Sequence, residues 1–248
     1  MYEEGKIMAK IAIDAGHGLY TEGKRCLKSL DPNETREWQL NERVARYVVE
    51  HLQKAGHEVK RLDDVTGQTD VPLKTRTNTA NNWGADFCVS IHHNAGINGG
   101  SGGGVVSIVY LKVGATTKKL QSEIYNNVIA QTGLKGNRAE PLAAMNLHMC
   151  RETKMPAVLI ENGYMDSTTD VPIILTDDFA RKCALGIAKG IVAVAGGKII
   201  ENQPQPQTTS NEAKYYVQVG AYLQKENAEK QLEIARSVGF SDAFIKKF

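Results

Sequence analysis

Four ionisable side chains stand where the sequence pattern could support chemistry: His17, Glu37, His92 and Glu161. Three of them follow apolar runs, since IAIDAG precedes His17, DFCVSI precedes His92 and AVLI precedes Glu161. In an open α/β sheet, ligands and reacting groups collect beyond the carboxyl ends of the strands, so these side chains are expected at one edge. Two histidines with one carboxylate are typical of catalytic zinc, which keeps a fourth position for water.

Glu37 reaches this edge from a predicted helix. Positions 37, 41, 44 and 48 follow one helical face, which is also the apolar face, so Glu37 points toward the core rather than into water. A buried carboxylate needs a partner, and a divalent cation would provide one. Glu34, which lies one turn earlier, is the rival carboxylate.

Each of these residues also has a purely structural interpretation. His17 stands between Gly16 and Gly18, where an imidazole can cap a turn. Glu37 can be an ordinary residue favoured by the field at a helix N-terminus. Glu161 precedes an Asn-Gly pair and can likewise cap a turn. A site is favoured by the combination of the four residues and not by any one of them.

The adjacent histidines His92 and His93 form an ambiguous pair. Neighbouring residues of a strand point to opposite faces of the sheet. His92 shares its face with Cys88 and Ser90, and His93 belongs to the other face. Only one of the two can therefore face the site, and the other is expected to be structural.

Three further polar residues are candidates for supporting roles. Asp14 either orients the His17 ring from behind or is a turn residue. Arg76 and Asn94 either orient the cleft and the substrate or have structural roles.

The elements that position these residues alternate between strand and helix. Residues 10–62 are predicted to form a strand, a loop, a helix with apolar residues at three- and four-residue steps, and a second strand after Gly56. Further helices are predicted over 73–85, 115–131 and 177–195, with strands over 86–94, 105–111 and 157–161 and an irregular stretch up to Met155. This order predicts an α/β fold, with a mostly parallel, twisted sheet and helices on both faces.

A change of composition after Gly197 marks a domain boundary. The segment ENQPQPQTTSNE has the Pro, Gln, Thr and Ser content of an extended linker. We predict a catalytic domain over 9–195, a linker over 196–213, and a small βαβ-like unit over 214–248. The helix of that unit carries apolar or Ala residues at positions 228, 232 and 235.

Charge and hydropathy exclude several classes of protein. The 248 residues include 30 Lys and Arg against 28 Asp and Glu, without a run of five like charges, which argues against a nucleic-acid surface. No apolar run reaches the roughly 18–20 residues that span a bilayer. The N-terminus contains no basic segment followed by an apolar stretch, so the sequence indicates no secretory signal. We therefore expect a protein made in the cytoplasm, starting at Met1 or Met8.

The four cysteines are expected to be free thiols. They lie far apart and form no C-x-x-C motif, so neither a zinc knuckle nor a dithiol redox pair is indicated. Cys88 falls within an apolar strand, where a free cysteine behaves as a small hydrophobic residue.

Four motifs resemble, in order and spacing, those of the zinc-dependent N-acetylmuramoyl-L-alanine amidases of the Amidase_3 type. They are IDAGHG, the helix pattern E-W-Q-L-N-x-x-V-A, R-x-x-x-A-N with ADFCVSIHHNAG, and PAVLIENGYMDS. The resemblance covers about residues 9–195. It implies hydrolysis of the amide bond between the lactyl group of N-acetylmuramic acid and L-alanine in bacterial peptidoglycan.

The resemblance also implies the roles of the site residues. It implies Zn²⁺ as cofactor, with His17, Glu37 and His92 as ligands and Glu161 as the catalytic residue, in agreement with the strand parity and the helical face. His93 is a departure, because members of the family often carry a small residue there. The loop Leu19–Arg36 is expected to border the cleft and to tune substrate choice.

The tail is similar to the repeat of SPOR-type (sporulation-related) peptidoglycan-binding modules. The similarity rests on V-Q-V-G-A-Y, then N-A-E, then G-F and F-I. Full modules contain two such repeats and this chain has one, which implies a wall-binding unit that could pair as a homodimer.

Two other functions and two routes to the wall stay open at this point. The same residues suit a zinc peptidase acting on the stem peptide, and a non-catalytic peptidoglycan-binding protein is the alternative outside enzymes. Without a secretory signal, the protein would act on the wall after release by lysis, as a phage endolysin or as a mother-cell autolysin at sporulation.

Overall fold

A six-stranded sheet forms the centre of the first unit of the chain. The computed structural model describes residues 9–200 and 225–237, and the chain divides into two units between Glu201 and Asn202. Neighbouring strands follow the order β2-β1-β3-β6-β4-β5. The strands are β1 (Lys10–Ala15), β2 (Glu58–Arg61), β3 (Phe87–Asn94), β4 (Val105–Val109), β5 (Leu142–Ala144) and β6 (Ala157–Tyr164).

Most neighbouring strands run parallel. β1 pairs in parallel with β2 and β3, β3 with β6, and β4 with β5, whereas β4 and β6 are antiparallel. β3 and β4 lie on either side of β6, and the connection between them has only ten residues, 95–104, too few for the helical crossover that would start β4 in the direction of β3. The predicted mostly parallel α/β sheet is confirmed, with this one reversal.

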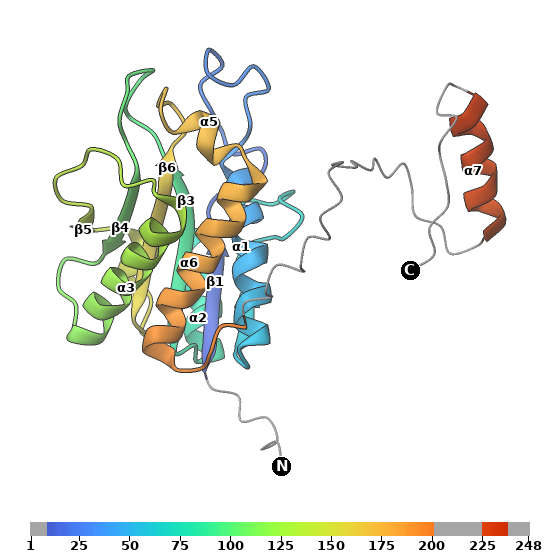
Figure 1. Cartoon of the computed structure of the whole chain (residues 1–248). Helices are drawn as coiled ribbons and strands as arrows, with labels where there is room; N and C mark the ends of the chain where they lie inside the picture. Colours follow the sequence, from blue (N-terminus) through green and yellow to red (C-terminus); the bar gives the residue numbers. More distant parts are fainter. Residues whose placement is uncertain (1–8, 201–224, 238–248) are drawn as a thin grey trace, which may run out of the picture. The chain divides into compact units, whose positions relative to one another are not determined.

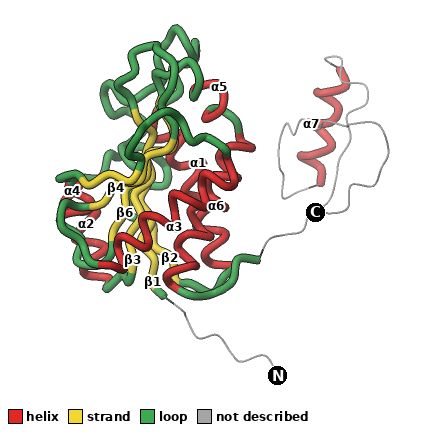
Figure 2. The backbone as a smooth tube through the Cα atoms, turned by 60° about the vertical axis from the view of Figure 1, so that its left-hand side comes forward, coloured by secondary structure: helices red, strands yellow, loops and turns green. Residues whose placement is uncertain are grey.

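Helices cover both faces of the sheet. Figure 2 shows α1, α3 and α6 on one face and α2 and α4 on the other. The helices of this unit are α1 (Glu37–Lys54), α2 (Leu73–Trp83), α3 (Ala115–Thr132), α4 (His148–Arg151), α5 (Val171–Ile174) and α6 (Asp177–Ala195). In the part of the chain that the structure describes, no helix is long and apolar enough to span a membrane.

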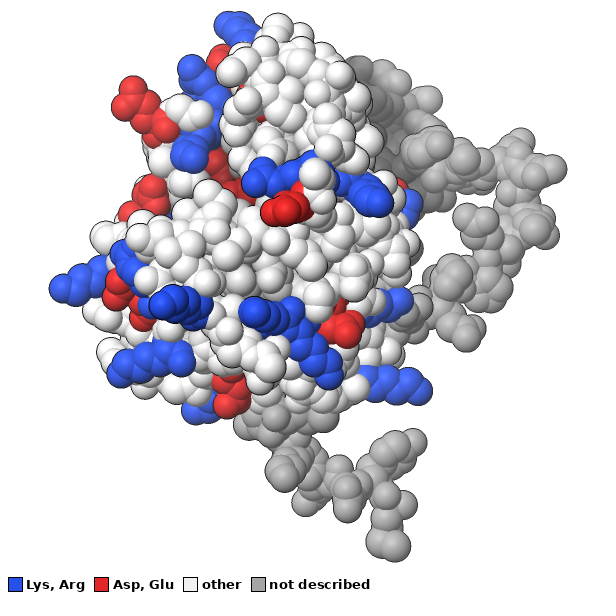
Figure 3. Space-filling view, turned by 90° about the vertical axis from the view of Figure 1, so that its left-hand side faces the viewer, with Lys and Arg blue, Asp and Glu red and all other residues white. Residues whose placement is uncertain are grey.

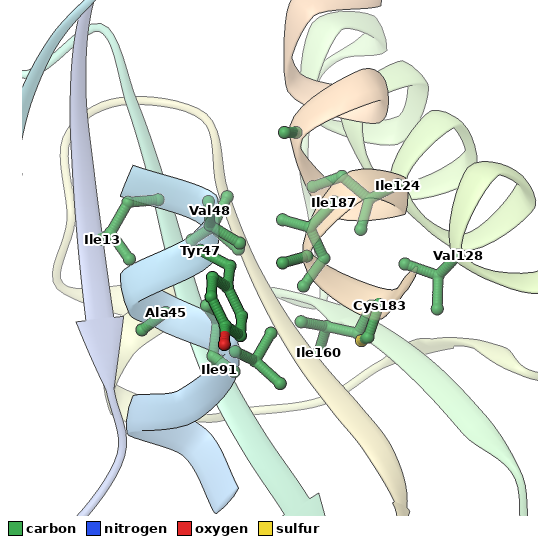
Figure 4. Packing of buried hydrophobic residues seen from close by; sticks show 14 of the residues in the cluster. Ile13, Ala45, Tyr47, Val48, Ile91, Ile124, Val128, Ile160, Cys183 and Ile187 are labelled. Atoms are coloured by element: carbon green, nitrogen blue, oxygen red, sulfur yellow. The ribbon is translucent and has the colours of Figure 1, made fainter. Parts of the chain in front are cut away.

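The main core lies between the sheet and the layer of α1, α6 and α3. Val48 of α1 and Ile187 of α6 are fully buried in one apolar cluster with Ile13 and Ile91 of the sheet, as Figure 4 shows. Burying each such side chain contributes roughly 1.5–3 kcal/mol. This packing fixes the rotation of α1 and therefore the direction of its first residue.

Three short elements were not expected. β5 and α4 lie within the stretch predicted to be irregular and span three and four residues, and α5, also of four residues, lies before the last predicted helix. Elements this short contain too few residues to show a hydrophobic period.

The second unit contains the predicted helix as α7 (Lys225–Ser237). The strands predicted on either side of it, and most of the predicted linker, lie outside the described residues. The domain limits and the SPOR-like character of the tail stay predictions.

The four cysteines Cys26, Cys88, Cys150 and Cys183 are free and buried. Burial raises the pKa of every one of these thiols, to about 12 for Cys26 and Cys150. Thiolate is the reactive form of cysteine, so we expect almost no labelling of the native protein by a thiol reagent at pH 8 and labelling of all four thiols in denaturant. Rapid labelling of one thiol in the native protein would contradict this burial.

Candidate active site

Three of the predicted residues meet at the carboxyl end of the parallel strands. His17 Nε2 lies 3.2 Å from Glu37 Oε2, and His92 Nδ1 lies 3.0 Å from Glu37 Oε1. One ligand atom from each residue falls within 4.8 Å of the other two. The two imidazole rings stand edge to face with centroids 5.0 Å apart. The loops that follow β1, β3 and β6 gather above this point, at the top of Figure 1.

A tight turn after β1 places His17. The Gly16 amide donates a hydrogen bond to the Ile91 carbonyl at 3.0 Å, which ties the turn to β3. His17 itself has φ 67°, in the left-handed region. That conformation is uncommon for residues other than glycine and persists only where the surroundings hold it.

The surroundings that hold this turn centre on Arg76, a residue of α2 that is only 1% exposed. Its five N–H groups find five acceptors, at 2.6 to 3.1 Å. These acceptors are Val71 O, Asp14 Oδ1, Ala15 O, His17 O and Asp70 Oδ1. Arg76 is therefore a structural residue that binds the backbone of the His17 turn, and burial keeps it from the substrate.

Asp14 supports the same turn from inside the sheet. Its two carboxylate oxygens accept hydrogen bonds from Arg76 Nη1 and from the Ser90 hydroxyl, both at 2.6 Å. Neither earlier expectation was right, because Asp14 belongs to β1 and not to a turn, and its partners are these two side chains rather than the His17 ring. It acts on His17 only through Arg76.

Glu37 is the first residue of α1 and is almost completely buried. Burial by itself would raise the pKa of its carboxyl, but the hydrogen bonds with His17 and His92 outweigh burial and hold the pKa below its ordinary value. The Asn41 amide lies one turn further along α1 and donates to Glu37 Oε1 at 3.4 Å and to Gly16 O at 3.1 Å. The rival Glu34 faces away, paired with Arg25 at 3.2 Å.

His92 and His93 divide between two environments. His93 is buried and donates from Nδ1 to Asn41 Oδ1 at 2.8 Å, while its Nε2 has no partner. Burial lowers the pKa of His93 to about 3, so this imidazole is neutral. His92 contacts Glu37, and His93 stands behind that contact and supports it through Asn41.

Glu161 lies beside His92, because the two residues are paired in register between β3 and β6. Burial raises its pKa to about 7, although the nearby His92 opposes this shift, and one of its carboxylate oxygens has no hydrogen-bond partner. It borders a cleft of about 270 Å³ together with the residues Glu22, Gly23, Lys24, Glu37, His92, His93, Asn94, Ala95 and Met165. The expectation that the loop Leu19–Arg36 borders the cleft is thus confirmed.

Sequence reasoning missed three residues around this cleft. Asn41 and Lys24 contact Glu37, and Asn162 donates to the His92 carbonyl at 3.1 Å while its own oxygen accepts from the Cys183 thiol. For Asn41 a signal existed, since it stands four residues after Glu37 on the same helical face. The other two depend on contacts between segments far apart in sequence.

A second hollow, of about 340 Å³, lies near Tyr110, Cys150 and Ala157, where β6 begins. It contains none of the four predicted residues. Figure 3 shows the side of the unit that carries β4 and β5, where Lys and Arg side chains lie in separate groups, several beside an acidic residue. The cleft that contains Glu161 is therefore the candidate active site.

Comparison with known proteins agrees with this geometry. Residues 11–193 match the family model Amidase_3, described as N-acetylmuramoyl-L-alanine amidase. The chain belongs to this amidase family. As a member, it is an enzyme that hydrolyses peptidoglycan.

Relatives of this amidase include bacterial and phage proteins. It is 35% identical over 240 residues to the sporulation-specific N-acetylmuramoyl-L-alanine amidase of Bacillus subtilis, covering 97% of this chain and 86% of that protein. It is 27% identical to an endolysin of Bacillus phage SPP1, covering 81% of this chain and 74% of the endolysin. The solved catalytic domain of the amidase CwlV from Bacillus (Paenibacillus) polymyxa gives a TM-score of 0.67 at 28% identity, covering 77% and 99% of the two chains.

Gly16 gives a direct test of the amidase site. A Cβ atom at this position would overlap the His92 imidazole. We expect Gly16→Ala to lower the rate of peptidoglycan hydrolysis about 10²-fold, because a small misplacement of a side chain at the reacting centre has effects of that size. Gly114→Ala is the control, because a Cβ there meets nothing within 4 Å. Equal rates of hydrolysis of purified cell walls by the two variants would rule out this packing.

The contacts of Arg76 with Asp14 and the His17 turn can be tested by a stability measurement. Arg76→Ala leaves the Asp14 carboxylate buried without its charged partner, so we expect a loss of about 3–5 kcal/mol in the free energy of unfolding. Arg181→Ala removes an exposed pair with Asp177 and should cost about 1 kcal/mol or less. Urea unfolding of both variants measures the difference, and similar losses would contradict the role given to Arg76.

Proposed function

We propose that this amidase cleaves the bond between the lactyl group of N-acetylmuramic acid and L-alanine with the help of a zinc ion held by His17, Glu37 and His92. One observation carries the proposal. Ligand atoms from a strand-end turn, a helix start and a second strand lie within 4.8 Å of one another. The family description and the relatives support the choice of bond.

The residues present fit a zinc ion. Two imidazole nitrogens and one carboxylate are a ligand set of catalytic zinc. Glu37 Oε2 is buried with His17 Nε2 at 3.2 Å and Lys24 Nζ at 3.7 Å, but neither contact has the geometry of a full hydrogen bond, so this oxygen keeps an acceptor position that a metal ion could use. When bound, zinc supplies Lewis acidity, which polarises an amide carbonyl and makes water a better nucleophile at neutral pH.

Glu161 is proposed as the group that moves the proton. Its carboxylate borders the cleft and does not belong to the cluster of ligand atoms formed by His17, Glu37 and His92. A carboxyl whose pKa lies at about 7 can accept a proton from the attacking water and pass it to the amine of L-alanine as that amine leaves. Asn94 also borders the cleft and is proposed to orient the substrate through its side-chain amide.

Two variants separate metal binding from proton transfer. We expect His17→Ala to lose both stoichiometric zinc and wall-lytic activity, because a ligand is gone. We expect Glu161→Gln to keep zinc and to lose activity by about 10²- to 10⁴-fold, because only the proton acceptor is gone. Zinc content and hydrolysis of purified cell walls are measured on the same samples. Full activity of either variant would contradict its proposed role.

The products decide between the candidate functions. Mass spectrometry of digested muropeptides is expected to reveal free lactyl carboxylates, the product of cleavage at the proposed bond. Cuts within the stem peptide would indicate the zinc peptidase instead, and intact walls would indicate a binding protein. Chelator treatment, followed by addition of zinc, tests the cofactor in the same assay.

We also propose that the protein reaches the cell wall after lysis and that its tail binds the wall. The relatives named as a sporulation-specific amidase and as an endolysin support action after lysis. The match to the former covers 97% of this chain and so extends into the tail. Wall binding by the region 214–248 and a pairing of two tails into a homodimer stay predictions of the sequence.

A further inference from the structure

Lys24 is the feature of the cleft that the proposed function leaves unused. Its ammonium lies 3.7 Å from Glu37 Oε2, and its side chain is 45% exposed. Among the described residues that line the cleft, Lys24 is the only Lys or Arg, whereas Glu22, Glu37 and Glu161 are all carboxylates.

The backbone of Lys24 is fixed to the start of α1. The Glu37 amide donates to the Lys24 carbonyl at 3.0 Å, and the Cys26 amide donates to the Thr35 carbonyl at 2.8 Å. An antiparallel bridge between Arg25 and Arg36 lies between these two bonds. This two-stranded ribbon holds Lys24 at the cleft. The side chains of Arg25 and Lys28, which follow it in the sequence, pair with Glu34 instead.

Two other cations of the same loop, Arg25 and Lys28, have an acidic partner outside the cleft, because they lie 3.2 Å and 3.9 Å from the carboxylate of Glu34. Lys24 instead shares Glu37 with His17 and His92. Once those three residues hold a dication, the ammonium stands beside a centre of net positive charge, which repels it. The ammonium is then available to a negative group of the substrate.

The exposure of Lys24 decides which negative group fits. Stabilising the charge that develops on a reacting carbonyl requires preorganised donors in a dry site. A half-exposed ammonium on a flexible four-carbon stem suits a carboxylate that arrives already charged. In peptidoglycan, the acidic residue that follows L-alanine offers such a group, since its α-carboxyl is free in some walls and amidated in others.

We propose that Lys24 binds the free α-carboxylate of the residue after L-alanine, so that the enzyme prefers stem peptides in which this group is not amidated. The inference rests on the proposed function, because it assumes that the stem peptide lies in this cleft. It makes Lys24 a residue that selects the substrate, and it gives the loop Leu19–Arg36 a defined part in that selection.

Binding to an inactive enzyme tests this role without turnover. The full chain with Glu161→Gln is loaded with zinc and titrated by calorimetry with two MurNAc-tripeptides, one containing D-glutamate and one D-isoglutamine at the second position. We expect the acid form to bind about fivefold more tightly. Adding Lys24→Gln should abolish this preference, whereas Lys28→Gln, a matched change in the same loop, should keep it. Zinc content is measured for every variant.

Kinetics with Glu161 intact complete the test. Lys24→Gln should raise KM for the acid form and have little effect on KM for the amidated form. Equal binding of the two peptides by the Glu161→Gln protein, or a preference that survives Lys24→Gln, would overturn the inference. An equal fall of kcat on both peptides would overturn it in favour of a role on the reacting carbonyl. Failure of the unmodified chain to cleave either peptide would instead contradict the proposed function.

Discussion

The buried carboxylate of Glu37 is the interaction on which the catalytic end of this fold depends. It contacts His17, His92, Asn41 and Lys24, which belong to four different segments of the chain. A charge removed from water is costly unless it is paired and hydrogen-bonded, so these contacts must form together. The Glu37 carboxylate therefore fixes the position of each of these segments, and the shape of the cleft depends on the contacts that balance its charge.

The direction of Glu37 is set at a distance by the hydrophobic core. Val48 and Leu52 of α1 are fully buried in that core, which fixes the rotation of the helix. Glu37 lies on the first turn of the same helix, so its side chain has no freedom to turn outward once this stripe is packed. On the other side, Arg76 holds the strained His17 turn through hydrogen bonds to the Ala15 and His17 carbonyls, while its other three donors bind Val71, Asp14 and Asp70. Apolar packing and one buried guanidinium thus orient the two halves of the site.

The sequence predicted the helices whose apolar residues recur with a helical period and the functional residues that stand at the ends of strands. The helix over 177–195 shows its apolar face in the sequence, and strand ends brought His17, His92 and Glu161 to one edge. Lys24 could not be found in this way, because its place depends on a ribbon between the loop and α1. The partners of Asp14 were also hidden, since Arg76 lies 62 residues away on α2. Periodicity reports which way a residue faces, but not which distant side chain it meets.

The charges of the cleft explain why a metal and a lysine belong together there. Glu22, Glu37 and Glu161 give the protein side of the cleft a surplus of negative charge over Lys24. The peptide part of peptidoglycan is itself acidic, so these side chains alone would repel it. Under the proposed function, a dication held by Glu37 would reverse the sign at the centre of the cleft and free the ammonium of Lys24 for the substrate. Substrate binding and metal binding would then be coupled through the same carboxylate.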